Sequence, residues 1–201
     1  MEGERETWKT EEFGASHEGA VGVLAEDGTV PRPVYFDAGS SGNIQSVSHW
    51  SVYDGQFNSV RAASLRGVCS CGWTGTEYPL DWDEIGDEDL ADAGARLAEK
   101  CTIDWDDHTE GVAAAALPLP EPVTALLEEL SREIEKLTKS SPLAAVRAVR
   151  RLEVAAVEVG YWAAREVRGD ATAEEAAAAL GLDEDAARSL LARLGRWSPY
   201  S

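Results

Sequence analysis

The spacing of apolar residues changes along the chain, from short segments separated by turn residues to a regular helical repeat. Between residues 20 and 80, apolar and β-branched residues form short segments bounded by Gly, Pro, Asn and Asp, which is typical of β-strands. Beyond residue 122, apolar residues recur every three or four positions, which is typical of helices. The pattern therefore predicts an α+β fold, in which a small antiparallel sheet with one helix is followed by an all-α bundle.

The β-rich segment is expected to supply the sheet. Asp27-Gly28 is a turn signal between two apolar segments and predicts a hairpin, whose second strand is an edge because it holds Pro31 and Pro33. From Asp87 to His108 the apolar residues share one face of a helix, which predicts the helix that covers the sheet. Strands are predicted at residues 20–24, 29–36, 46–53, 57–68 and 76–80.

Four helices are predicted in the second half of the chain. Pro142 suits the first position of the second helix, and Thr172 and Glu175 have the spacing of a capping box at the start of the third. Gly181 ends the third helix, and Asp183 caps the fourth. The predicted helices cover residues 123–137, 142–168, 173–180 and 184–194.

Composition divides the chain into a flexible tail (1–18), an acidic β-rich module (19–112), a proline-rich linker (113–122) and a helical domain (123–201). The net charge of −19 is uneven, because residues 1–112 hold 7 basic against 23 acidic residues and residues 113–201 hold 11 against 14. An acidic surface repels phosphate backbones, so we expect any contact with nucleic acid to come from the second half.

The sequence also limits location and class of activity. It holds no apolar run long enough for a membrane span, and its N-terminus lacks the basic and apolar regions of a secretion signal. We therefore expect a cytoplasmic protein with reduced cysteines and no membrane partner. No Ser/His/Asp or Cys/His set with catalytic spacing is visible in the sequence, so we expect no enzymatic activity.

All three cysteines and one of the three histidines lie within forty residues of one another. Cys69 and Cys71 stand on a turn that contains Gly72, and Cys101 and His108 lie on the predicted helix. Reduced thiols and imidazoles in such a group are the ligands of structural Zn²⁺, and no substrate cleft is specified nearby. The sequence therefore predicts a structural zinc site formed by Cys69, Cys71, Cys101 and His108.

The sequence offers more than one residue for the fourth ligand. Cys101 and His108 are two helical turns apart, about 10.5 Å, so one ion reaches both only if the helix unwinds or ends between them. Asp104 precedes His108 by one turn, and His49 lies in a predicted strand, so both remain alternatives to Cys101. His17 lies in the predicted tail and has no expected partner.

The Cys69-Ser-Cys71-Gly-Trp73 motif and the later Asp104-Trp-x-x-His108 motif together resemble small actinobacterial zinc-binding proteins of unassigned role. The resemblance covers residues 48–110. It implies a small zinc-binding module made of β-strands and a helix, and it implies no activity.

The C-terminal segment holds two short predicted helices around Gly181, with small residues where two helices would cross. Over residues 145–196 it resembles the helix-turn-helix of bacterial regulators and of the DNA-reading region of sigma factors. The resemblance implies a trihelical fold that presents residues 183–194 for recognition. Three carboxylates, Asp183, Glu184 and Asp185, stand where a recognition helix normally meets DNA. The candidate DNA contacts are Arg188, Ser189, Arg193 and Arg196.

These features predict a non-enzymatic, DNA- or transcription-associated regulatory protein, with DNA bound through the C-terminal half and a protein partner through the acidic module. The alternative is a protein-interaction adaptor or a DNA-mimicking inhibitor that does not bind DNA itself. A narrow apolar stripe from Val123 to Leu137 suits pairing with another helix, so a homodimer is a further candidate partner in both cases.

Overall fold

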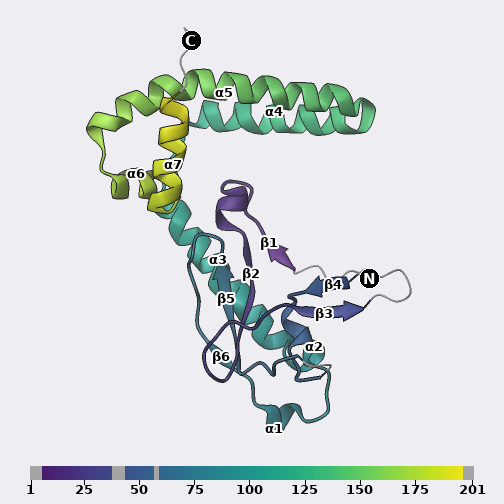
Figure 1. Cartoon of the computed structure of the whole chain (residues 1–201). Helices are drawn as coiled ribbons and strands as arrows, with labels where there is room; N and C mark the ends of the chain where they lie inside the picture. Colours follow the sequence, from purple (N-terminus) through teal and green to yellow (C-terminus); the bar gives the residue numbers. More distant parts are fainter. Residues whose placement is uncertain (1–5, 38–43, 57–58, 197–201) are drawn as a thin grey trace. The chain divides into compact units, whose positions relative to one another are not determined.

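The computed structural model describes residues 6–37, 44–56 and 59–196 (Figure 1). Its main sheet has four antiparallel strands in the order β1-β2-β5-β6, and it is combined with several helices, which confirms the predicted α+β class. The chain forms two compact units, residues 1–113 and residues 114–201. None of the described helices is both long and apolar enough to span a membrane.

The main sheet is organised around the pairing of its two central strands. β2 is paired with β5 from Gly19 opposite Cys69 to Leu24 opposite Ser64. Side chains alternate between buried and partly buried along β5, whereas every residue of β2 is buried except Gly22, which is partly buried. The strands are β1 (Thr7–Trp8), β2 (Gly19–Leu24), β5 (Ser64–Cys69) and β6 (Tyr78–Pro79).

The predicted hairpin between residues 20–24 and 29–36 is wrong. Asp27-Gly28 does form a turn, in which the Gly28 N–H donates to the Ala25 carbonyl at 2.9 Å. However, β2 pairs with β5, which is some forty residues away, and not with the segment that follows the turn. Pro31 and Pro33 lack the N–H groups that a strand beside β2 would donate, which explains why this segment leaves the sheet.

A separate two-stranded sheet contains β3 (Val34–Asp37) and β4 (Ile44–Val47). The strand predicted at 46–53 therefore ends early, and a 3₁₀-helix, η2 (Trp50–Val52), follows because the His49 side chain accepts a hydrogen bond from the Ser51 N–H. The strand predicted at 57–68 is confirmed only from Ser64 onward, and residues 57–58 lie outside the described residues.

Helix α3 (Ala95–Ala115) packs against the main sheet, and the short helices α1 (Trp82–Ile85) and α2 (Leu90–Ala93) precede it. Two glycines in the strands allow the close approach. A Cβ atom at Gly19 would lie 2.4 Å from the Trp105 indole nitrogen, and one at Gly67 would lie 2.8 Å from the Cys101 carbonyl oxygen. The core between helix and sheet includes Val21, Val23, Leu65, Leu90 and Cys101.

The prediction of a flexible tail at residues 1–18 is wrong for residues 6–18, and residues 1–5 lie outside the described part of the chain. β1 pairs with β2, and the Trp8 ring lies 5.7 Å from the Trp105 ring. The 3₁₀-helix η1 (Gly14–His17) follows β1, and His17 is only 3% exposed. Aromatic packing and strand pairing thus hold a segment that composition alone marks as unstructured.

The C-terminal unit contains four helices, α4 (Glu121–Ser140), α5 (Pro142–Asp170), α6 (Ala173–Leu180) and α7 (Glu184–Gly195). The predicted capping box is present, and Gly181 adopts the left-handed conformation (φ 61°) that ends α6. Residues 116–120 connect α3 to α4, so the connection is shorter than the linker predicted at 113–122. α4 and α5 pack side by side, and α7 packs against both α5 and α6 (Figure 1).

Candidate metal centre

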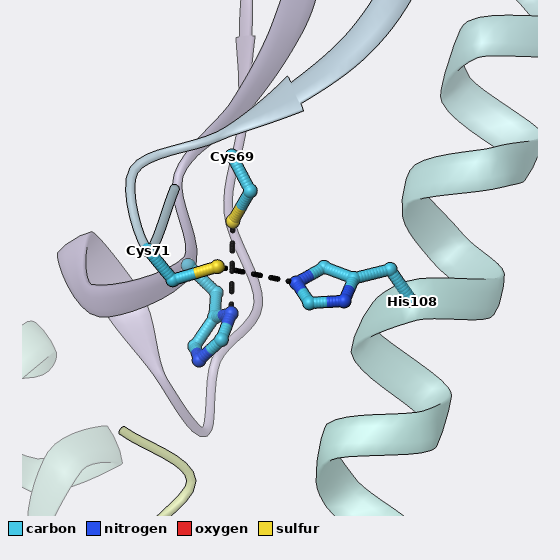
Figure 2. A group of neighbouring side chains, drawn as sticks. Cys69, Cys71 and His108 are labelled. Atoms are coloured by element: carbon cyan, nitrogen blue, oxygen red, sulfur yellow. Dashed lines mark hydrogen bonds between the residues drawn. The ribbon is translucent and has the colours of Figure 1, made fainter. Parts of the chain in front are cut away.

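The two cysteines of the Cys-x-Cys motif stand on a tight turn at the end of β5. The Gly72 N–H donates to the Cys69 carbonyl at 3.0 Å, and the Cys69 N–H donates to the Trp73 carbonyl at 2.9 Å. Gly72 has a φ of 92°, a conformation that L side chains rarely adopt. The turn therefore brings the thiols of Cys69 and Cys71 close together, and Figure 2 shows both pointing into the same space.

Helix η1 is fastened to this turn by hydrogen bonds of Ser70. The Ser70 N–H donates to the Glu18 carbonyl, and the Ser70 hydroxyl donates to the Ala15 carbonyl, both at 2.9 Å. Because Gly19 is opposite Cys69 in the sheet, His17 lies next to the first thiol. The distance from His17 Nδ1 to Cys69 Sγ is 3.6 Å.

His108 approaches the turn from helix α3 (Figure 2). Its Nε2 lies 3.4 Å from Cys71 Sγ. The Trp73 ring stacks on the imidazole with 4.5 Å between the ring centroids and 6° between the planes. This stacking fixes the plane of the imidazole, so that Nε2 faces the thiol.

The four potential ligand atoms of His17, Cys69, Cys71 and His108 all lie within 4.8 Å of one another. A tetrahedral zinc ion with bonds of about 2.3 Å to sulfur and about 2.05 Å to nitrogen separates sulfur from nitrogen by about 3.6 Å. The distances from His17 Nδ1 to Cys69 Sγ, 3.6 Å, and from His108 Nε2 to Cys71 Sγ, 3.4 Å, match this value. The cluster is therefore compatible with a metal site, and its donors fit zinc.

Burial shifts the pKa of Cys71 and of His108 in opposite directions. Burial raises the pKa of the Cys71 thiol to about 11, and the neighbouring Cys69 acts in the same direction. Burial also lowers the pKa of His108, and the adjacent His17 adds to this effect. The surroundings thus favour a neutral Cys71 thiol and a neutral His108 imidazole. A divalent cation would reverse this preference at Cys71, because its charge stabilises a thiolate, and binding would release a proton.

Three of the four predicted ligands, Cys69, Cys71 and His108, come together in the structure, and Cys101 does not. Cys101 is fully buried in the core between α3 and the sheet. Helix α3 is continuous from Cys101 to His108, so the two turns that separate these residues keep them apart. The prediction of Cys101 as a ligand is therefore corrected, and His17 contributes the fourth potential ligand atom of the cluster.

The two alternatives to Cys101 also lie outside the cluster, and each has a structural role of its own. The Asp104 carboxylate accepts hydrogen bonds from the Thr76 N–H at 3.0 Å and from the Tyr78 hydroxyl at 3.0 Å, which ties the segment after the turn to α3. His49 Nδ1 lies 2.8 Å from the Ser51 hydroxyl at the start of η2.

Sequence reasoning missed His17 because the residue stands in a charged segment without a hydrophobic pattern. The only signal was its position two residues before a strand, Gly19–Leu24. That signal becomes informative only when this strand is known to pair with the strand that ends at Cys69. Nothing local in the sequence specifies that pairing.

The residues predicted to contact DNA lie on or just after helix α7, where they are exposed. The guanidinium group of Arg188 forms ion pairs with both Glu184 and Asp185 in the first turn of the helix. Arg188, one of the four predicted DNA contacts, is therefore already paired with carboxylates of α7. The other three predicted contacts are Ser189, Arg193 and Arg196.

Comparison with protein-family models, with curated proteins and with solved structures finds no match to this chain.

Proposed function

We propose that His17, Cys69, Cys71 and His108 bind one structural zinc ion, and that the N-terminal unit is a zinc-stabilised module without catalytic activity. The observation that supports this proposal is the convergence of two thiols and two imidazoles within 4.8 Å. Two sulfur and two nitrogen ligands form a common set at structural zinc sites.

Four protein ligands fill the tetrahedral coordination of zinc and leave no position for a water or a substrate. A catalytic zinc ion, by contrast, keeps one position open. The four side chains come from three separate parts of the chain, η1, the turn after β5, and α3. An ion that joins them would act as a cross-link, and its binding energy would contribute to folding.

Metal analysis of the purified full chain tests this proposal, and Co²⁺ substitution reports the ligands through the intensity of its absorption bands. We expect one zinc per chain in the wild type and loss of zinc in Cys69→Ser. The matched control is Cys101→Ser, because Cys101 is a buried thiol outside the cluster and its replacement should leave one zinc per chain. Equal zinc content in all three proteins would contradict the proposed ligand set.

For the biological role, we propose a regulatory protein that acts through protein contacts. The ion pairs of Arg188 with Glu184 and Asp185 favour the adaptor alternative over direct DNA binding, because DNA phosphates would have to compete with two carboxylates. DNA- or transcription-associated regulation remains the second candidate, supported by the exposed Arg193 and Arg196 on the same part of the chain.

Titration with random duplex DNA at low and at high salt separates the two roles. An adaptor should show no binding in either condition. A DNA-binding regulator should bind at low salt, lose affinity steeply as the salt concentration rises, and lose it further in the double variant Arg188→Ala/Arg193→Ala.

A further inference from the structure

Helix α4 has an apolar stripe but buries none of its side chains, all of which the structure describes. Ile134 and Leu137, near its C-terminal end, are only half-buried, and the first half of the stripe is exposed. Leu126, for example, is 65% exposed. A helix with this stripe and no core contributes little stability by itself, because most helical stability in proteins comes from packing of the apolar face. The exposed members of the stripe are Val123, Leu126, Leu127 and Leu130.

The apolar face of α5 is covered around Gly160 and exposed near the N-terminal end of the helix. At Gly160 an added Cβ atom would lie 2.8 Å from a Leu194 side-chain atom, so α7 covers this part of the helix closely. Val149 and Val146 precede Gly160 by eleven and fourteen residues, about three and four turns, and therefore lie on the same side of α5. Val146 is 65% exposed, and Leu143, one turn earlier, is 84% exposed. The face that α7 covers thus continues uncovered toward the N-terminal end of α5.

The charges of the α4–α5 hairpin are separated along its length. Residues 131–151, which surround the connection between the two helices, hold six basic and two acidic residues, a net charge of +4. Residues 121–130 and 152–161 form the other end of the hairpin and hold five acidic and no basic residues, a net charge of −5. The hairpin therefore has a basic end and an acidic end of nearly equal charge.

We infer that the α4–α5 hairpin is the dimer interface of this protein, and that the hairpin of a second copy packs on it in the reversed direction to form a four-helix bundle. This inference is independent of the proposed zinc site. Two-helix hairpins with open apolar faces complete a core in this way. A twofold axis places the same surface on both partners, so a surface with opposite charges at its two ends is complementary to itself when one copy is reversed.

The separation of charge favours a second copy of the chain as the partner, and it favours packing in the reversed direction. A second copy in the reversed direction brings each basic end against an acidic end. A second copy in the same direction would bring like charges together at both ends, which opposes association. DNA would find its basic contacts only at one end of this surface and would meet five carboxylates at the other.

Sedimentation velocity of the full chain tests the dimer. At about 100 µM we expect a particle of twice the 21.6 kDa of one chain. Leu126→Gln/Val146→Gln should weaken dimerisation at least about tenfold, because both exposed side chains lie on the proposed interface. The control is Ile103→Gln, which replaces an exposed apolar residue on α3 and should leave dimerisation unchanged. A monomeric wild type, or an undiminished dimer in Leu126→Gln/Val146→Gln, would overturn the inference.

Charge reversal tests the direction. Glu128→Arg/Glu129→Arg should weaken the reversed dimer by about tenfold, because it removes most of the negative charge of one end. Asp87→Arg/Glu88→Arg makes the same change of net charge on exposed residues outside the hairpin and serves as the control. Circular dichroism of each variant checks that its helices are intact. Tighter dimerisation of Glu128→Arg/Glu129→Arg than of this control would indicate parallel copies and would overturn the proposed arrangement.

Discussion

The two units of this protein build their cores from different kinds of contact. In the N-terminal unit, strands and ligands that are tens of residues apart in sequence converge, as in the pairing of Gly19 with Cys69. In the C-terminal unit, each helix packs mainly on helices that are close to it in sequence, and much apolar surface stays exposed. The first unit therefore depends on a few specific long-range constraints, and the second depends on helix propensity and capping.

The largest expected effect is that of metal removal on the N-terminal unit. Because the proposed zinc ion joins three segments, a chelator should remove on the order of 10 kcal/mol of stabilisation and unfold this unit. The near-ultraviolet circular dichroism signal, which reports the packed tryptophans, should be lost. The far-ultraviolet signal of helices α4–α7 should remain. Zinc added back should restore the near-ultraviolet signal. Melting curves that coincide with and without chelator would contradict the role given to the ion.

High pH should also act mainly on the N-terminal unit, through Cys101. Burial is the main cause that raises the pKa of this thiol from 9.0 to about 12, and Asp104 acts in the same direction. A raised thiol pKa means that the folded state holds its proton longer than the unfolded state. Stability from this group is therefore present below pH 9 and is lost as the pH rises toward 12, by up to about 1.4 kcal/mol per pH unit. Urea denaturation at pH 8 and pH 10 measures the loss, which should be smaller in Cys101→Ala.

Replacement of Gly67 should reveal how tightly α3 is packed on the sheet. A Cβ atom at Gly67 would lie 2.8 Å from the Cys101 carbonyl oxygen, which is backbone and cannot rotate away. Gly67→Ala should therefore lower the free energy of unfolding by about 1–3 kcal/mol. The control is Gly111→Ala on helix α3. Apart from the backbone of α3 itself, no described atom lies within 4 Å of a Cβ atom added there. This control should be neutral or stabilising by up to about 1 kcal/mol.

The smallest effect is expected at the start of α6 in the C-terminal unit. The Thr172 hydroxyl accepts a hydrogen bond from the Glu175 N–H at 3.2 Å, and the Glu175 carboxylate accepts one from the Thr172 N–H at 2.8 Å. Thr172→Ala should cost about 1 kcal/mol in thermal unfolding of the helices. Thr138→Ala, inside the last turns of α4, removes a hydroxyl that donates to the Ile134 carbonyl within the same helix and should be nearly neutral. Equal losses in both variants would show that the cap has no special role.

The difference between the units also explains what the sequence could predict. The four helices of the second unit were predicted, and so were the caps of α6 and α7, because capping and helical periodicity depend on residues within four positions of one another. The hairpin at 20–36 was wrong, because the choice between a near and a distant strand partner depends on the whole sheet.

The candidate site shows the same limit. Cys69, Cys71 and His108 could be identified from chemistry and spacing, whereas Cys101 was included because the core face of a helix and a ligand face have the same periodicity. His17 could not be found, because its position depends on the pairing of β2 with β5 and on the hydrogen bonds of Ser70. The residue types and their spacing were thus enough to predict the turn and its two thiols. The position of His17 depends on the pairing of distant strands.

The position of His108 on α3 has a consequence for synthesis of the protein. His108 follows His17 by ninety-one residues, so the cluster cannot be completed until helix α3 has been made. Before that moment the nascent chain exposes two thiols without their histidine from α3. The unit should therefore acquire its final form in one late step during translation, and cells that are depleted of zinc or exposed to oxidants should accumulate it as an immature, protease-sensitive species.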